Sequence, residues 1–175
     1  HTARLMGCAG DPIVETPCMD ALAAAGTRFD AAYTSCPLCV PARFSFMTGQ
    51  RPGPFGLLSN GTMPSDIATV AHSLGAAGYE TVLCGRMHFF GPDQSHGVER
   101  RIMNDFTPGM PGRSGSARTE LGPYVNTPRN EWERLYGGGE DSPVLAYDRA
   151  VIEAALAELE RPHERPLFLV VGTYG

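Results

Sequence analysis

Apolar residues recur at helical spacing in two segments of the chain. In residues 65–78 they fall three or four positions apart, which predicts an amphipathic helix with Ser65 as its N-cap. These positions are Ile67, Val70, Ala71, Leu74 and Ala77. A longer helix is predicted to begin at Ser142-Pro143, with an apolar stripe made of Val144, Tyr147, Val151, Ile152, Ala155, Leu156 and Leu159. Each helix should pack one face against a core.

Short apolar runs predict strands in three places. "YETVLC" (79–84) directly follows the first of these helices. "PLFLVVG" (166–172) is a continuous apolar run, as expected of a buried parallel strand, and "TRFDAAYT" (27–34) predicts a third strand. Helices that alternate with short apolar strands indicate an α/β fold with a largely parallel sheet.

Two further helices carry start and stop signals. Thr16 and Pro17 supply an N-cap and a first-turn proline for a helix that ends at Gly26. Pro41 begins a second helix, which Gly49 ends. Residues 107–143 are instead rich in Gly and Pro. This composition predicts either a surface excursion that shapes a pocket mouth or a disordered insertion.

Length and charge narrow the class of protein. The chain has 175 residues and a net charge of −5, and all 14 basic residues are Arg. A net negative chain without basic runs argues against nucleic acid as a partner. No apolar run approaches the ~20 residues that cross a bilayer, so no membrane association is expected, and no signal peptide is visible. The five cysteines do not form a secreted disulfide pattern, which favours a cytoplasmic protein over a periplasmic or secreted one.

The stretch "SCPLCVPARFSFMTG" (35–49) has two incompatible interpretations. Cys36 and Cys39 have the C-x-x-C spacing of redox dithiols and of half a zinc site. Alternatively, Cys39 lies at the start of the helix that Pro41 begins, with Arg43 one turn later. Helix amides and a guanidinium there would favour an anionic substrate. A buried structural cysteine is a third interpretation that the spacing leaves open.

Two linked motifs add a resemblance. "CVPAR" with "FSFMTG" resembles the first signature of the sulfatase family, and "GYETVLCGRMH" (78–88) resembles the second. "HFFGPDQSHGVE" (88–99) is most similar to the branch that contains choline-sulfatases and phosphonate monoester hydrolases. The resemblance implies an alkaline-phosphatase-like sandwich in which helices flank a central, largely parallel sheet. It also implies that residues 1–175 are an N-terminal part of one catalytic domain, with metal-ligand segments before 1 and after 175.

The resemblance further implies a chemistry for each matching residue. Cys39 would be converted to Cα-formylglycine by a formylglycine-generating enzyme, and its hydrate would attack the ester. This modified residue would be one ligand of a divalent cation, most often Ca²⁺ and sometimes Mn²⁺ or Mg²⁺. Arg43 would hold the diol and its oxygens on the metal side, and His88 would hydrogen-bond the second hydroxyl of the diol and help that hydroxyl lose its proton. Arg86 and Asn60 would contact the anion of a small sulfate or phosphate ester.

One departure from the family pattern affects the anion site. Arg86 stands where the family has Lys, and a guanidinium can bind oxygens bidentately but cannot give up a proton. The leading hypothesis is a sulfuric-ester hydrolase. The alternatives are a phosphonate or phosphate mono- or diester hydrolase on the same scaffold, a non-catalytic sulfatase-like protein and a C-x-x-C redox or metal module. The sequence does not decide the ester or the oligomeric state.

Overall fold

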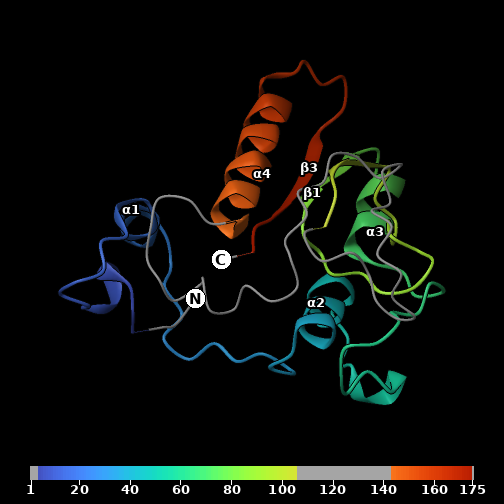
Figure 1. The fold of residues 1–175 in the computed structure, drawn as a ribbon, viewed down its shortest axis with the longest axis horizontal. Coiled ribbons are helices and arrows are strands. Elements are labelled where there is room, and N and C mark those ends of the chain that lie inside the picture. The colour runs from blue at the N-terminus through green and yellow to red at the C-terminus, as the bar shows by residue number, and fades with distance from the viewer. Residues whose placement is uncertain (1–3, 106–142, 175) are drawn as a thin grey trace. The chain divides into compact units, whose positions relative to one another are not determined.

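A three-stranded parallel sheet forms the centre of the larger part of the chain. The computed structural model describes residues 4–105 and 143–174, with β1 (Glu80–Gly85) between β2 (Arg100–Met103) and β3 (Leu167–Gly172) (Figure 1). Both neighbours of β1 run parallel to it, and the register pairs Glu80 with Leu167 and Gly85 with Gly172. The prediction of a parallel α/β sheet is therefore confirmed. The predicted excursion over residues 107–143 lies outside the described residues except for the start of one helix.

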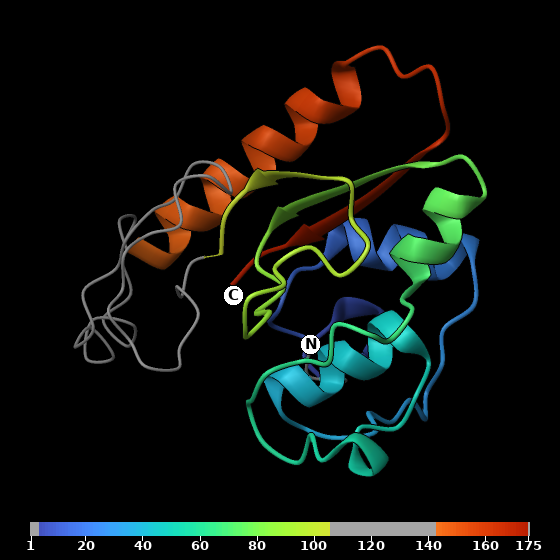
Figure 2. The ribbon, with the colours of Figure 1, turned by 90° about the vertical axis from the view of Figure 1, so that its right-hand side faces the viewer.

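Helices cover both faces of this sheet. Figures 1 and 2 show α4 (Pro143–Glu160) on one side of the strands and α2 (Cys39–Thr48) and α3 (Val70–Ala76) on the other. Because successive strand side chains alternate in direction, Leu83 packs with Phe44 of α2, whereas Cys84 packs with Tyr147 of α4. None of the helices in the described residues has the length and apolar content that crossing a bilayer requires.

Of the three helices that flank the sheet, α4 begins at Pro143 as predicted, whereas α2 and α3 each begin at a different residue from the one predicted. α2 starts at Cys39, two residues before Pro41, and Gly49 ends it with φ 69°. α3 starts at Val70 and is capped by Thr69, not by Ser65. The amide of His72 bonds the Thr69 hydroxyl, and the His72 ring accepts the Thr69 amide, so this reciprocal capping box fixes the helix start.

Burial of α4 and β3 is less complete than the apolar pattern predicts. Tyr147, Val151 and Ala155 of α4 are buried, but Ile152 and Leu156 are exposed. β3 is a parallel strand as predicted, yet most of its residues are only half-buried and Val171 is exposed. A continuous apolar run therefore located the strand correctly but overstated how much of it is covered in the described residues.

Residues 1–34 form a separate compact unit, with η1 (Gly7–Ala9) and α1 (Pro17–Ala25). α1 begins at Pro17 as predicted, but the Thr16 side chain does not cap it. The Thr16 hydroxyl donates to Asp20 at 2.9 Å and accepts the amide of Gly7. The same Asp20 carboxylate accepts the Cys8 amide at 2.7 Å, so Thr16 and Asp20 join the two helical elements of this unit.

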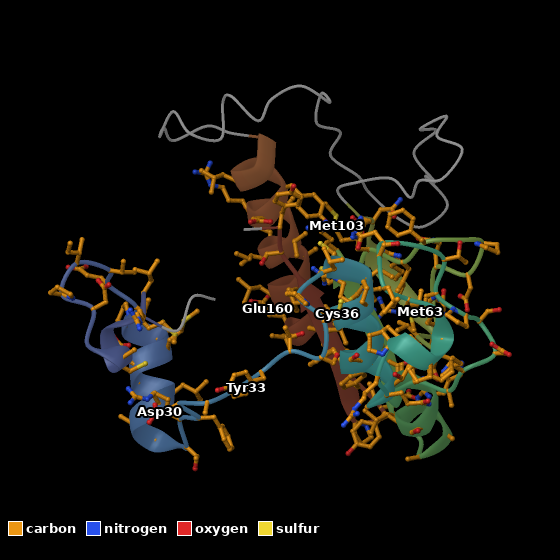
Figure 3. The ribbon with its side chains drawn as sticks, turned by 90° about the horizontal axis from the view of Figure 1, so that it is seen from below. Asp30, Tyr33, Cys36, Met63, Met103 and Glu160 are labelled. Atoms are coloured by element: carbon orange, nitrogen blue, oxygen red, sulfur yellow. The ribbon has the colours of Figure 1, made fainter. Side chains whose placement is uncertain are left out.

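The prediction of a strand at residues 27–34 is wrong. This segment, which carries the labelled Asp30 and Tyr33 in Figure 3, is irregular. Phe29 and Tyr33 are strongly exposed, and no described strand pairs with the segment. A β-strand requires a neighbour for its backbone hydrogen bonds, which an apolar pattern alone cannot guarantee.

Candidate active site

Cys39 is the first residue of α2, and its side chain is exposed. The preceding Leu38 is extended and makes no side-chain cap. Asn60 takes over part of that role from a distant segment, because its Oδ1 accepts the amide of Val40 at 3.0 Å. The structure thus places Asn60 beside the helix start that carries Cys39, and its contact with the anion stays a prediction.

The carboxyl end of β1 places the second group of predicted residues. Gly85 has φ 88°, and a Cβ atom there would collide with the carbonyl oxygen of Gly172, so only glycine fits. The amide of Arg86 donates to that same carbonyl at 2.7 Å. The chain therefore leaves β1 against the end of β3, which fixes the backbone from which Arg86 and His88 extend. Ligands of open parallel sheets bind at this edge.

Arg43 connects α2 to the segment after β1. Its Nη1 donates to the carbonyl oxygen of Arg86 at 3.2 Å and to the Met87 sulfur at 3.7 Å. Burial lowers the pKa of Arg43, the charge of Arg86 lowers it further, and Asp105 and Cys39 act in the opposite direction. The guanidinium remains charged all the same. Arg43 is thus a largely desolvated cation next to a second one, an arrangement that attracts an anion.

Arg86 is nearly buried, with 11% of its side chain exposed. Its guanidinium carbon lies 4.5 Å from the centre of the Tyr174 ring, and its Nε lies 3.8 Å from Asp105 Oδ1. Nε is buried and has no hydrogen-bond partner among the described residues. Such an unsatisfied buried donor is uncommon, and it indicates a capacity to bind a further acceptor.

His88 has an unusual backbone and an uncharged ring. Its φ is 55°, which few non-glycine residues adopt. The His88 amide donates to Asp105 Oδ2 at 2.6 Å, and Nδ1 of the ring is buried without a hydrogen-bond partner in the described part of the chain. Burial lowers the pKa of His88 to about 4, with Arg86 and Arg43 adding to the effect and Asp105 opposing it. The imidazole is therefore neutral at neutral pH, where it can accept a hydrogen bond or a proton from a group bound beside it.

The structure therefore brings Arg43, Arg86 and His88 into one cluster and links Cys39 to it through Arg43. Sequence reasoning missed Asp105 and Tyr174, which contact this cluster. Asp105 lies two residues after the end of β2, so it lies at the same carboxyl edge of the sheet as Arg86. Identifying β2 in the sequence would have supplied that signal.

The C-x-x-C interpretation finds no support in the structure. Cys36, labelled in Figure 3 on the segment that leads into α2, is half-buried, and no disulfide joins it to Cys39. Within the described residues, one group of three has ligand atoms close enough to share a metal ion, and it contains no cysteine. Neither a disulfide nor a zinc site is formed by this pair.

That group, Glu80, Glu158 and His163, does not fit the expected catalytic cation. It lies at the amino end of β1, whereas Arg86 follows the carboxyl end. Arg100 donates to both carboxylates, and His163 Nδ1 lies 2.8 Å from Glu80. The His163 side chain is mostly covered, with 14% of it exposed. The group is an ion-pair network whose carboxylates already have cationic partners.

The described residues near Cys39 do not form a cation cage either. The nearest carboxylate of the cluster, Asp105, accepts the His88 amide and lies beside Arg86. The prediction that the other metal ligands lie outside residues 1–175 therefore stays a prediction. The described residues do fit a formylglycine at position 39. The Cys39 side chain is exposed and so open to modification, and neither His88 Nδ1 nor Arg86 Nε has a described hydrogen-bond partner.

Known proteins with related sequences share one description. A family model described as Sulfatase matches residues 2–175. The choline-sulfatase of Rhizobium meliloti strain 1021 is 49% identical over 96 residues, which cover 54% of this chain and 19% of that protein. Human arylsulfatase A is 38% identical over 96 residues, covering 50% of this chain and 19% of the relative. The chain thus spans about a fifth of the length of these curated relatives.

Solved structures show the same likeness at the level of the fold. A protein in complex with its substrate D-glucosamine-2-N,6-O-disulfate is 33% identical, with a TM-score of 0.53, over 58% of this chain and 20% of its own. The phosphonate monoester hydrolase of Agrobacterium radiobacter is 18% identical, with a TM-score of 0.62, over 95% of this chain and 37% of its own. The second likeness concerns the fold alone, and it confirms the predicted fold class.

Proposed function

Because the chain belongs to the sulfatase family, we propose that the protein of which it is part hydrolyses sulfuric esters of small molecules. The relatives that share its sequence are sulfatases of several kinds, including choline-sulfatase and arylsulfatase A. The chain spans about a fifth of their length, so we propose the activity for the whole protein, to which these residues contribute one part of the site.

One observation carries the proposal. Two guanidinium groups and a neutral imidazole converge where α2 begins and β1 ends, and Arg43 joins them through its bond to the Arg86 carbonyl. A half-buried Arg43 beside a nearly buried Arg86, whose Nε has no described partner, favours an anion, and a neutral histidine beside them favours proton transfer. An ion-pair network built for stability would have satisfied these groups instead.

The residues take roles that follow from their positions. Arg86, held between Tyr174 and Asp105, binds oxygens of the ester anion. Arg43 orients the nucleophile at position 39 on its own helix, and Asn60 supports the start of that helix. After attack by one hydroxyl of the hydrated residue 39 has displaced the alcohol, His88 would accept the proton of the second hydroxyl, so that the C–O bond to sulfate breaks and the aldehyde is restored. A formylglycine at position 39 would supply the attacking hydroxyl once hydrated, and a divalent cation, Ca²⁺ or else Mn²⁺ or Mg²⁺, would lower the pKa of that hydroxyl.

A phosphate or phosphonate ester is the second candidate substrate. Its tetrahedral anion would meet the same two guanidinium groups, and the Agrobacterium phosphonate monoester hydrolase has a similar fold. Arg86 in place of the family Lys can bind either anion bidentately. The described cluster therefore fits an ester of sulfur or of phosphorus, and residues elsewhere in the site would select between the two.

Turnover by the complete enzyme tests the proposal. The protein, purified from its native host so that Cys39 is matured, is assayed with choline sulfate, an aryl sulfate, an aryl phosphate diester and an aryl phosphonate. Each assay is run after chelation and after adding back Ca²⁺, Mn²⁺ or Mg²⁺. We expect a higher kcat/KM for a sulfate ester than for either phosphorus ester and loss of turnover on chelation. Preference for a phosphorus ester would establish the alternative, and no turnover of any ester would contradict both.

A further inference from the structure

Asp105 is a buried carboxylate that no sequence motif of the site includes. It lies two residues after the end of β2, with 5% of its surface exposed. Its two oxygens face different residues of the cluster: Oδ2 accepts the His88 amide, and Oδ1 lies 3.8 Å from Arg86 Nε. A single carboxylate thus contacts the backbone of one proposed catalytic residue and the side chain of another.

We propose that Asp105 is a positioning residue that holds His88 and Arg86 in their working orientations. This inference rests on the proposed function, since it assigns a task within that site. It adds a residue that follows β2, a strand that carries none of the residues predicted from the motifs.

The contact with His88 stabilises an otherwise unfavourable backbone. A non-glycine residue with positive φ costs on the order of 1 kcal/mol or more unless its surroundings hold it. The 2.6 Å bond from the His88 amide to Oδ2 is short and charge-assisted, which makes it one of the stronger hydrogen-bond types. Holding the backbone also fixes the point from which the imidazole extends. The Phe90 ring, whose centre lies 4.7 Å from that of the imidazole, packs edge-on against it and restrains the ring itself.

The contact with Arg86 orients a guanidinium without consuming its donors. At 3.8 Å, Oδ1 attracts the charge of Arg86, but Nε forms no hydrogen bond within the described residues. The Tyr174 ring lies against the same guanidinium at 4.5 Å. Two neighbours thus restrain the group while its donors remain free of described acceptors. A substrate oxygen is the partner that such a preorganised donor requires.

Asp93 provides a matched control in the same segment of chain. Its carboxylate also accepts backbone amides, those of Ser95 and His96 at 2.9 and 3.0 Å, and so fixes a turn. The described contacts of Asp93 do not include Arg43, Arg86 or His88. If Asp105 only stabilised the fold, replacing either aspartate would have similar consequences.

Three variants of the complete enzyme test the inference: Asp105→Ala, Asp105→Asn and Asp93→Asn. An asparagine oxygen can still accept the His88 amide, but it does not attract Arg86. We therefore expect Asp105→Asn to raise KM for the sulfate ester about tenfold with a smaller change in kcat, and Asp105→Ala to lower kcat about 10²-fold as well. Asp93→Asn should keep both constants within about twofold of the wild type. Melting temperatures confirm that each variant is folded.

A second readout does not depend on activity. Hydrogen–deuterium exchange is followed by mass spectrometry on peptides that contain the His88 amide. We expect faster exchange of that amide in Asp105→Ala and near wild-type exchange in Asp105→Asn and Asp93→Asn. Equal exchange in all proteins, or equal losses of kcat/KM in the Asp93 and Asp105 variants, would overturn the inference. If the wild type hydrolyses no ester, the proposed function fails, and the exchange data still decide whether Asp105 holds His88.

Discussion

Charged residues lie at both ends of β1, but their hydrogen bonding differs between the two ends. At the amino end, Glu80 and Glu158 share Arg100, and His163 bonds Glu80. At the carboxyl end, Arg43, Arg86 and His88 gather around the single carboxylate of Asp105. The first group pairs its charges, whereas the second leaves Arg86 Nε and His88 Nδ1 without described partners.

The causes of the pKa shifts differ in the same way. Hydrogen bonds from Arg100 and then His163 lower the pKa of Glu80 to about 2, and donating that bond to Glu80 raises the pKa of His163. Burial, rather than a partner, is the main reason why the pKa of His88 and of Arg43 is lowered. Satisfied charges stabilise the folded state, while desolvated and unsatisfied ones indicate a functional site. The comparison predicts that substitutions at the carboxyl end cost activity and substitutions at the amino end cost stability.

The largest effect is expected at Cys39. Cys39→Ala removes the precursor of the nucleophile, so kcat should fall more than about 10³-fold without a loss of stability, because the side chain is exposed. Cys39→Ser should release about one product per enzyme and then stop, since a serine ester lacks the route by which a hydrate expels sulfate. Steady-state and burst kinetics measure both. Cys36→Ser is the control, and full activity in Cys39→Ala would contradict the assignment.

The next effect is expected at Arg86. Arg86→Ala should lower kcat/KM for a sulfate ester about 10²- to 10³-fold, because a preorganised donor to the anion is lost. Arg86→Lys restores a cation and should recover most of this loss. The measurement is kcat/KM of the three proteins together with their melting temperatures. An Arg86→Ala enzyme with unchanged kcat/KM would mean that this end of the sheet does not bind the anion.

Arg100 should show the opposite pattern. Arg100→Ala leaves Glu158, a buried carboxylate, without its main partner, so the free energy of unfolding should fall by about 1–2 kcal/mol after allowing for solvent screening of the half-buried Arg100. Activity below the melting transition should stay within about twofold of the wild type. Arg165→Ala, which breaks an exposed pair with Glu99, is the control. A large loss of kcat/KM in Arg100→Ala would erase the distinction between the two ends.

The smallest effect concerns pH. The folded pKa of Glu80 is lowered from 4.5 to about 2, so its stabilisation is present above pH 4.5 and is lost as the pH falls towards 2. The folded pKa of His163 is raised above 6.5, so its stabilisation is present below pH 6.5 and is lost as the pH rises through the folded value. Unfolding of the wild type and of His163→Asn across this range provides the test. A wild-type profile that stays parallel to that of His163→Asn as the pH falls through and below 6.5 would show that the Glu80–His163 bond contributes nothing.

The sequence predicted much of the fold because most elements carry their own signals. Pro17, Gly49 and the apolar run at 166–172 each mark an element that the structure contains. β2 was missed because it begins with two arginines, which look like a solvated turn. Arg100 pairs with Glu80 and Glu158, and Arg101 donates to the carbonyls of Gln94 and Gly85. Only tertiary contacts explain why such residues belong in a strand.

For the candidate site too, some residues could be predicted from the sequence and others could not. The two motifs led to Cys39, Arg43, Arg86 and His88, because each motif keeps its residues at a fixed spacing. Asp105 lies outside both motifs, and only the pairing of β2 with β1 brings it to His88. The opposite error occurred at residues 27–34, where an apolar pattern predicted a strand without the neighbour that a strand needs. Local signals therefore located residues, and long-range pairing decided which of them meet.

The mass of the peptide that contains residues 36 and 39, in protein purified from its native host, tests the central claim most directly. We place the nucleophile at position 39, at the start of α2, which Arg43 links to Arg86 and His88 at the carboxyl end of β1. We therefore predict an aldehyde in place of the Cys39 thiol and an unmodified Cys36 thiol. An intact Cys39 thiol in protein that turns over a sulfate ester would contradict it.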